Sequence, residues 1–393
     1  MGHIDWTPLE SIGGLLDDPI AQILAGAAAE RVLDKTLRAH KSATPDERTA
    51  IAEALFGISL WRRRLAFHLG PTDASPSALL QSLRDDIGRL ASEPPPNLAE
   101  RFSFPDWVAK VLEAEASSDA WALADALNTP GPVTFRANVS RTTLEGLQAL
   151  LAREDVVTRP GAYSPTALVV TSPRPNVLAL GPVQSGLCEV QDEGSQLIGQ
   201  LVEARHGMRI LDLCAGAGGK TLQLAAQVGN EGRVLAFDTD LERLQRLERR
   251  AARAGLLRRI DIFRALPTDS LAVDAVLVDA PCSELGALRR GPDLRFRLKP
   301  ESASTFPALQ ESLLDTAAHH VRPGGRIIYA TCTFARQENE DVVASFLGRH
   351  PRHVVRAPGL ESALLTPQGF LRTFPHRHGT DGFFGAVLED LRA

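Results

Sequence analysis

Apolar residues recur every three to four positions through the first third of the chain, which is the period of an amphipathic helix. The pattern is clear in IAQILAGAAAERVLDKTLRAH at 20–40 and in ERTAIAEALFGISLWRRRLAFHL at 47–69. It is interrupted near SEPPPN at 92–97 and ends at NTPGP, 128–132, because clustered prolines and glycines break helices. We therefore predict an all-helical domain over residues 1–127.

Short strand-like runs flank one helical run in the next fifty residues. PVTFRAN opens this segment, and TALVVT at 166–171 and NVLAL at 176–180 predict two further strands. Between PVTFRAN and TALVVT, Thr142 or Thr143 is suited to cap a helix that continues through LEGLQALLARE. We therefore predict a small α/β element over residues 128–180.

Short apolar runs alternate with helical runs from residue 181 onward. This alternation predicts a parallel, doubly wound α/β sheet of the Rossmann type over residues 181–393, with ligands bound beyond the carboxyl ends of its strands. The predicted strands are RILDL, RVLAF, RIDIF, AVLVD and RIIYA, and the helical runs are KTLQLAAQV, DLERLQRLERRAARAGL and PALQESLLDTAAHHV.

A glycine-rich loop follows the first of these strands and predicts a nucleoside cofactor site. Its glycines allow a tight turn and a close approach to a ligand, and the helix after it directs its first amides toward that ligand. The spacing fits neither the phosphate loop nor a complete dinucleotide fingerprint. Asp238, after the second strand, is placed to accept hydrogen bonds from ribose hydroxyls, as in enzymes of NAD or of S-adenosylmethionine. The loop residues predicted to bind cofactor are Cys214, Ala215, Gly216, Ala217, Gly218, Gly219 and Lys220.

The chain has four cysteines, and two of them follow predicted strands directly. Cys282 comes just after AVLVD and Cys332 just after RIIYA, at the sheet edge where ligands are expected. Cys188 and Cys214 are expected to be buried. The spacings match neither a metal pair nor a disulfide framework, which favours a reduced cytoplasmic protein without a structural metal.

Charge is unevenly distributed, although the net charge is only −5. Residues 1–130 carry a net charge of −7 and the remainder +2. One predicted helix bears Arg243, Arg246, Arg249, Arg250 and Arg253, which fit a solvated face as well as a phosphate site. A second cluster, in one loop, contains Arg289, Arg290, Arg295, Arg297 and Lys299 around Phe296. No apolar run reaches about 18 residues, and the acidic start MGHIDWTPLESIGG lacks the features of a secretory signal, so neither a membrane span nor export is expected.

The ordered motifs of the C-terminal two thirds resemble those of the RNA 5-methylcytosine methyltransferases. The resemblance covers about 130–393, and with the helical region before it the layout is similar to the RsmB type, which has a NusB-like RNA-binding domain at its N-terminus. It rests on VQDEGSQL, DLCAGAGGKT, FDTD, VLVDAPCS, RRGPDLRFR, YATCTFARQENED and TDGFFGAVL.

The resemblance implies S-adenosylmethionine as cofactor, RNA as substrate and a monomeric enzyme. It implies that Cys332 is the nucleophile, that Cys282 assists product release, and that Asp279 and Lys220 act beside them, with Asp279 also close to the cofactor. The small α/β element would help to recognise RNA. The arginines expected to contact the RNA backbone are Arg289, Arg290, Arg295 and Arg297.

Two positions depart from the family pattern. After the third strand, where the family often has an acidic residue, this chain has Ala265, with only Asp269 nearby. The sequence therefore does not identify the residue that contacts adenine. Ala217 stands where proline is common, which alanine tolerates.

Three alternatives remain from the sequence. A transfer-RNA cytosine methyltransferase would carry the same motifs. A nicotinamide-dependent dehydrogenase would explain the glycine loop and Asp238 but leaves both cysteine motifs without a role. A non-catalytic RNA-binding or ribosome-assembly factor could keep the fold, although both cysteines are present.

Overall fold

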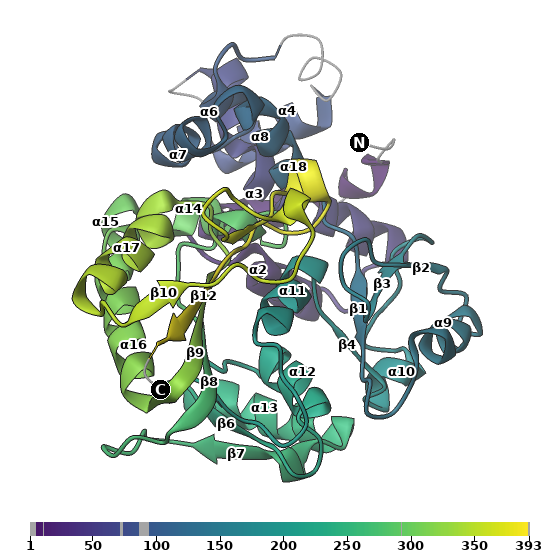
Figure 1. Cartoon of the computed structure of the whole chain (residues 1–393). Coiled ribbons are helices and arrows are strands. Elements are labelled where there is room, and N and C mark those ends of the chain that lie inside the picture. Colours follow the sequence, from purple (N-terminus) through teal and green to yellow (C-terminus); the bar gives the residue numbers. More distant parts are fainter. Residues whose placement is uncertain (1–4, 11, 71–73, 86–93, 292, 392–393) are drawn as a thin grey trace. The chain divides into compact units, whose positions relative to one another are not determined.

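The chain forms two compact units, which we call the helical unit and the α/β unit. The structure is a computed structural model, and it describes residues 5–10, 12–70, 74–85, 94–291 and 293–391. The helical unit comprises 1–130 and 288–303, and the α/β unit comprises 131–287 and 304–393 (Figure 1). Within the described ranges, no helix is both long and apolar enough to cross a membrane.

The helical unit begins with the helices that the periodicity predicts. The run at 20–40 is divided into α1 and α2, and the run at 47–69 lies within one long helix, α3. Thr44 caps α3 in a capping box, because its hydroxyl accepts from the Glu47 amide and the Glu47 carboxylate accepts from the Thr44 amide. Of SEPPPN, Ser92 and Glu93 lie outside the described residues. The helices are α1 (Asp17–Leu24), α2 (Ala29–Ala39), α3 (Pro45–Leu69), α4 (Pro76–Asp85), α6 (Leu98–Arg101), α7 (Asp106–Ala116), α8 (Ala120–Asn128), α14 (Leu294–Arg297) and α15 (Pro300–Ala303).

The segment 288–303 packs with the helical unit, although the sequence placed it in the catalytic domain. Its anchor is Arg295, which is fully buried. Its guanidinium lies 4.1 Å from the Phe104 ring and donates to Asn128 Oδ1 at 2.6 Å and to the Phe102 carbonyl at 3.3 Å. Burial lowers the pKa of Arg295 to about 9. The expectation that Arg295 contacts RNA is therefore wrong for this conformation, because its charge is enclosed within the protein.

A small antiparallel sheet opens the α/β unit, with strands in the order β2-β3-β1-β4. Thr143 caps the predicted helix, since its hydroxyl accepts from the Gly146 amide at 3.0 Å. NVLAL is a turn and not a strand, because it leads directly into the Gly181–Pro182 start of α10. β4 pairs with β1, so this sheet extends past the boundary predicted at 180. The elements are β1 (Thr134–Ala137), α9 (Leu144–Ala152), β2 (Thr158–Pro160), β3 (Ala167–Val170), α10 (Gly181–Gln184) and β4 (Cys188–Val190).

The large sheet has the order β10-β12-β9-β8-β5-β6-β7, with β11 beside β12. The five predicted strands form its parallel part, β9-β8-β5-β6-β7, which confirms the doubly wound fold. The antiparallel strands at its other side were not predicted. Its elements are α11 (Glu193–Leu201), β5 (Arg209–Asp212), α12 (Gly219–Gln227), β6 (Arg233–Phe237), α13 (Leu241–Ala254), β7 (Ile260–Phe263), β8 (Val273–Asp279), α16 (Phe306–His320), β9 (Val321–Thr331), α17 (Glu340–Arg349), β10 (His353–Val355), β11 (Leu371–Arg372), α18 (Pro375–His378) and β12 (Phe384–Asp390).

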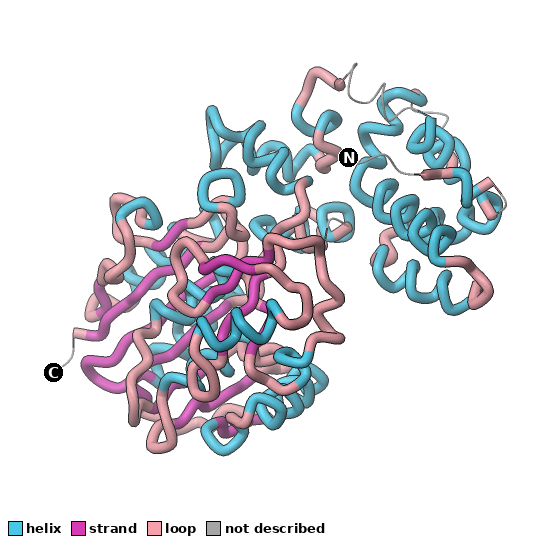
Figure 2. Tube along the Cα trace, turned by 90° about the vertical axis from the view of Figure 1, so that its right-hand side faces the viewer, coloured by secondary structure: helices cyan, strands magenta, loops and turns pink. Residues whose placement is uncertain are grey.

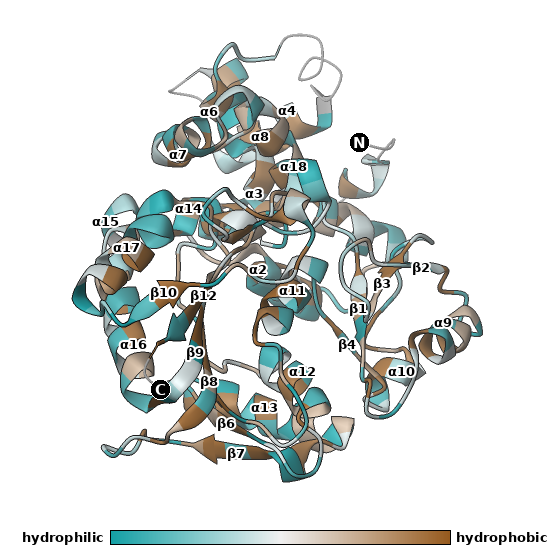
Figure 3. Ribbon diagram, viewed as in Figure 1, coloured by the Kyte–Doolittle hydropathy of each residue, from teal (hydrophilic) through white to brown (hydrophobic). Residues whose placement is uncertain are grey.

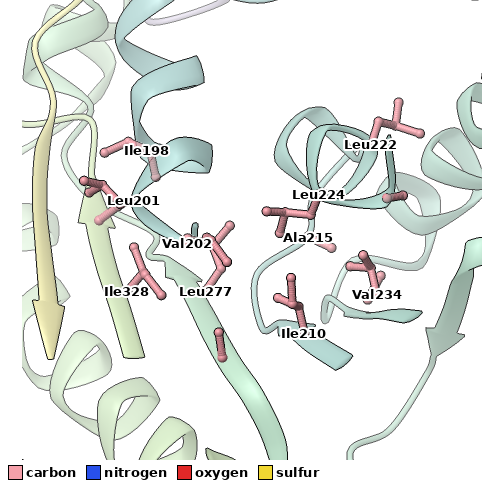
Figure 4. Packing of buried hydrophobic residues seen from close by; sticks show 14 of the residues in the cluster. Ile198, Leu201, Val202, Ile210, Ala215, Leu222, Leu224, Val234, Leu277 and Ile328 are labelled. Carbon is pink, nitrogen blue, oxygen red and sulfur yellow. The ribbon is translucent and has the colours of Figure 1, made fainter. Parts of the chain in front are cut away.

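Helices cover both faces of the large sheet (Figure 2). Successive strand residues point to opposite faces, so each strand contributes side chains to a core on either side. In β8, Leu277 packs in the core beneath α11, α12 and α13, whereas Val276 and Val278 pack in the core beneath α16 and α17. Figure 3 shows the strands as apolar bands, and Figure 4 shows the first of these cores, where Leu201 of α11 and Ile328 of β9 contribute.

Replacement of Arg295 by alanine should destabilise the helical unit by roughly 2–4 kcal/mol, because the Asn128 amide oxygen would lose its buried donor and the Phe104 ring would lose the guanidinium beside it. The matched control is Arg297→Ala, in the same short helix. It removes an exposed ion pair with Asp293, which is worth less than about 1 kcal/mol. Urea unfolding followed by circular dichroism measures both, and equal midpoints for the two variants would contradict the structural role of Arg295.

Candidate active site

Four strands of the large sheet deliver polar side chains to the same carboxyl edge. Asp212 ends β5, Asp238 follows β6, Asp279 ends β8 and Cys332 follows β9. These residues line one cavity of about 650 Å³, a volume that suits a nucleoside-sized ligand. The sheet topology therefore brings together residues that are up to 120 positions apart in the chain.

The glycine loop lies against this cavity. Every predicted loop residue except Gly218 lines it. Gly218 is instead buried with φ +88°, and a Cβ there would lie 2.7 Å from Leu247 of α13. Gly218 is therefore required for the turn and for close packing, and its contact with the cofactor remains a prediction. The Gly216 amide donates to Asp238 Oδ2 at 2.8 Å, which fixes the acid relative to the loop.

Two of the aspartates that line the cavity, Asp212 and Asp238, are held by hydrogen bonds to nearby residues. Asp238 Oδ1 accepts from the Asp240 amide, and Asp240 in turn caps α13. Asp212 Oδ2 accepts from the Thr221 hydroxyl at 2.7 Å, whereas its Oδ1 is buried and has no partner among the described residues. Burial raises the pKa of Asp212 to about 7. A carboxylate oxygen of this kind suits a ligand that carries a positive charge.

Lys220 and Asp279 form an ion pair beside the glycine loop. Lys220 Nζ lies 2.6 Å from Asp279 Oδ2, and the ammonium is 5.4 Å from the centre of the Phe383 ring. The lysine side chain is 11% exposed and the aspartate 30%, so Asp279 keeps part of its surface open to the cavity. The structure thus places the two residues that the sequence predicts to act together within one hydrogen bond of each other.

The two cysteines that follow strands meet at the edge of the cavity. Cys282 Sγ and Cys332 Sγ are 3.4 Å apart, and both residues line the cavity. The hydrogen bond with Cys282 and burial raise the pKa of Cys332 well above its ordinary value. Cys332 is therefore a protonated thiol at neutral pH in the ligand-free protein. Of the other two cysteines, Cys188 is buried in the core of the small sheet, as predicted, and Cys214 is partly exposed to the cavity.

A buried polar network, which the sequence analysis did not single out, joins the two cysteine loops. Ser283 Oγ and Thr333 Oγ1, the residues after the two cysteines, are 2.9 Å apart. Glu338 is fully buried and accepts from the Ser283 hydroxyl, from the Ser283 amide at 3.0 Å and from Gln310 Nε2 at 3.1 Å. Burial raises the pKa of Glu338. The signal was present in the ARQENED motif, but glutamates in a polar run are ordinarily exposed.

Other predicted positions lie outside this cavity. Ala265 and Asp269 do not line it, whereas the α16 residues Phe306, Leu309 and Leu313 form an apolar wall that the sequence analysis missed. Arg289, Arg290 and Arg297 belong to the helical unit, where Arg297 pairs with Asp293. Their contact with RNA remains a prediction.

Alkylation of Cys332 by iodoacetamide should be slow at neutral pH. Its rate should rise about tenfold per pH unit between about pH 7 and 9, because the thiolate fraction grows in this way below a raised pKa. Peptide mass spectrometry would assign the modified cysteine. In Cys282→Ala the same reaction should be faster at each pH, since the hydrogen bond that contributes most to the shift is gone. A rate that levels off near neutral pH in the unaltered protein would contradict the raised pKa.

The amino-acid sequence of the chain matches known protein families and individual relatives. Residues 200–389 match the family 16S rRNA methyltransferase RsmB/F, and residues 104–176 match the Methyltr_RsmF/B-like, ferredoxin-like domain. The chain is 34% identical to the ribosomal RNA small subunit methyltransferase B of Thermus thermophilus over 78% of this chain and 70% of that protein. The protein of the same name from Vibrio cholerae is 32% identical, over 79% of this chain and 71% of that protein.

A solved structure shares the fold along nearly the whole chain. The crystal structure of PH0851 has a TM-score of 0.79 at 23% identity and covers 99% of both chains. The sequence identities over more than two thirds of the curated relatives, together with the matched family regions, show that this chain belongs to the 16S rRNA methyltransferase RsmB/F family.

Proposed function

We propose that the protein methylates carbon 5 of a cytosine in small-subunit ribosomal RNA through a transient bond between Cys332 Sγ and carbon 6 of the base. Membership of the family makes it an RNA methyltransferase, and its cofactor is S-adenosylmethionine. The cytosine chemistry rests on one observation above all. Two cysteines lie 3.4 Å apart in the lining of the cofactor cavity, to which an ion-paired aspartate and lysine also contribute.

The cavity fits S-adenosylmethionine by the chemistry of its lining. Asp238 would accept hydrogen bonds from the ribose hydroxyls. Asp212 Oδ1, which lacks a partner among the described residues, would accept from the ammonium of the methionine part. The apolar side chains of α16 suit the adenine ring. When bound, the cofactor supplies an electrophilic methyl group. NSun6 from Pyrococcus horikoshii, of similar fold with a TM-score of 0.67, was crystallised with SFG, an analogue of this cofactor.

Cys332 would carry the covalent step. Carbon 5 of cytosine is a poor nucleophile until a group adds at carbon 6 and directs electron density to it. A thiol can add there and later leave again, which a hydroxyl does far less well. Because the Cys332 thiol is protonated at rest, its proton must depart as the sulfur–carbon bond forms. The balanced outcome is that the ring gains a proton at N3 as it gains sulfur at carbon 6.

Asp279 is suited to guide that proton. Its carboxylate borders the cavity between the glycine loop and the cysteines, and Lys220 fixes one of its oxygens. The other oxygen can hydrogen-bond the N3 and N4 edge of the base and stabilise the charge that develops on the ring. Lys220 would act as a positioning residue here, because it holds the carboxylate in place.

Cys282 would assist the final step. After carbon 5 has gained the methyl group, its proton must leave and the bond from Cys332 to carbon 6 must break. Cys282 is the side chain in direct contact with the Cys332 sulfur, so it is placed, once deprotonated, to accept the proton from carbon 5. The electron pair of that carbon–hydrogen bond then restores the double bond between carbons 5 and 6, and Cys332 leaves as a thiolate that takes up the proton held at N3. A nicotinamide-dependent reaction would give neither cysteine a role.

The RNA acted on is proposed to be 16S ribosomal RNA, because the curated relatives described above are ribosomal RNA small subunit methyltransferases. Transfer RNA is the alternative, since the cysteine site itself does not distinguish the two. Bisulfite sequencing of both RNA classes from a deletion strain separates them. Loss of one 5-methylcytosine in 16S ribosomal RNA is expected, and loss confined to transfer RNA would overturn this assignment.

The Cys332→Ser variant should lose methyl transfer to RNA by roughly two orders of magnitude or more, since a hydroxyl is a much weaker nucleophile than a thiol. The Cys282→Ala variant should instead accumulate a protein–RNA adduct, seen as a shifted band on a denaturing gel. The double variant should show no adduct. Full turnover in Cys332→Ser, or rapid product release without adduct in Cys282→Ala, would overturn the mechanism.

A further inference from the structure

We propose that a cluster of two arginines and a glutamate, Arg136, Glu189 and Arg250, positions the glycine loop and thereby sets the affinity for the cofactor. The cluster comes from β1, β4 and α13 of the α/β unit. It gives a role to Arg250, one of the five arginines on the helix for which the sequence left two interpretations open. The inference rests on S-adenosylmethionine binding at the loop but not on cytosine chemistry.

The two arginines hold the loop by its backbone carbonyls. Arg250 Nη1 donates to the Ala217 carbonyl at 2.6 Å, and Arg136 Nη1 donates to the Gly219 carbonyl at 2.6 Å. These carbonyls flank Gly218, whose positive φ makes the turn. Neither arginine lines the cofactor cavity, whereas Ala217 and Gly219 do. The arginines therefore support the loop without occupying the place of the ligand.

Glu189 holds the cluster together. Its carboxylate accepts from Arg250 Nη2 at 2.8 Å and Nε at 3.1 Å, and from Arg253 Nη2 at 2.7 Å. It lies opposite Arg136 in the antiparallel pairing of β1 and β4. Arg136 and Glu189 are about 95% buried, which makes their charges costly unless each is paired. The loop carbonyls complete this pairing, so a displaced loop would leave buried donors without acceptors.

The anchored carbonyls also set the direction of loop amides. A peptide unit is planar, so its carbonyl and the following amide point in opposite directions. With the Gly219 carbonyl held by Arg136, the Lys220 amide at the start of α12 is directed away from that arginine. Arg136 also donates to the Gln191 side chain, whose Nε2 donates to Ser195 Oγ at 3.0 Å. Gln191 and Ser195 both line the cavity, so one buried guanidinium orders two parts of its wall.

The small sheet is thus part of the support of the cofactor site. Two of the three cluster residues lie on its strands, although every carboxylate predicted to meet the cofactor lies on the large sheet. A change confined to β1 or β4 is therefore expected to weaken cofactor binding.

The test compares Arg250→Ala with Arg253→Ala. Both arginines lie on α13, pair with Glu189 and have similar exposure, 25% and 32%, but only Arg250 contacts the loop. Titration calorimetry of the full chain with S-adenosylhomocysteine, without RNA, measures the dissociation constant. We expect it to rise roughly tenfold or more in Arg250→Ala, the change that follows loss of a charge-assisted hydrogen bond, and less than about twofold in Arg253→Ala.

A second variant and a kinetic readout separate positioning from folding. Arg250→Lys keeps a charge beside Glu189 but lacks the second arm of the guanidinium, so it should also bind more weakly. For both Arg250 variants, KM for S-adenosylmethionine should rise while kcat at saturation stays within about twofold. Unchanged affinity in the Arg250 variants, or equal losses at Arg253, would overturn the proposal. Both of these affinity results come from calorimetry without RNA, so they would not bear on the proposed cytosine mechanism.

Discussion

The active site depends on the parallel pairing of β8 with β9. In this register Asp279 lies opposite Ala330, so the chain leaves both strands at the same level and in the same direction. Cys282 comes three residues after Asp279 and Cys332 two residues after Ala330. A shift of the register would separate the sulfurs and would also turn buried side chains toward the wrong face. The contact between the two sulfurs is therefore a consequence of the same apolar packing that stabilises the sheet.

The sequence predicts this central architecture well, because the architecture follows from the hydrophobic period of each segment and from the order of strands and helices along the chain. The apolar runs from RILDL to RIIYA alternate with helical runs, and that rhythm is enough to specify parallel strands with ligands at their carboxyl ends. The positions of Asp238, Asp279, Cys282 and Cys332 follow from where each run stops. The prediction fails where pattern is weak, as at NVLAL, whose apolar residues are used in a turn before α10, and at the antiparallel strands near the C-terminus.

The hydrophobic pattern of the sequence does not show which charged side chains are buried. Arg295 and Glu338 lie in polar stretches of sequence and Arg136 lies in a strand-like run, yet each is buried and hydrogen-bonded in the folded protein. Whether a charged side chain faces solvent depends on partners distant in the chain, such as Asn128 for Arg295, so a local pattern assigns it to the surface. Each of these residues holds a segment in place: α14 on the helical unit, the cysteine loops on one another, and the glycine loop on its sheet.

The chain also passes between its two units more than once, since 288–303 lies within the α/β sequence but packs with the helical unit. During synthesis, the first 130 residues emerge from the ribosome long before this insert does. Until it arrives, the ring of Phe104 and the amide of Asn128 lack the guanidinium that fills the space between them. The helical unit therefore cannot complete its packing until residues 288–303 have been synthesised, late in translation.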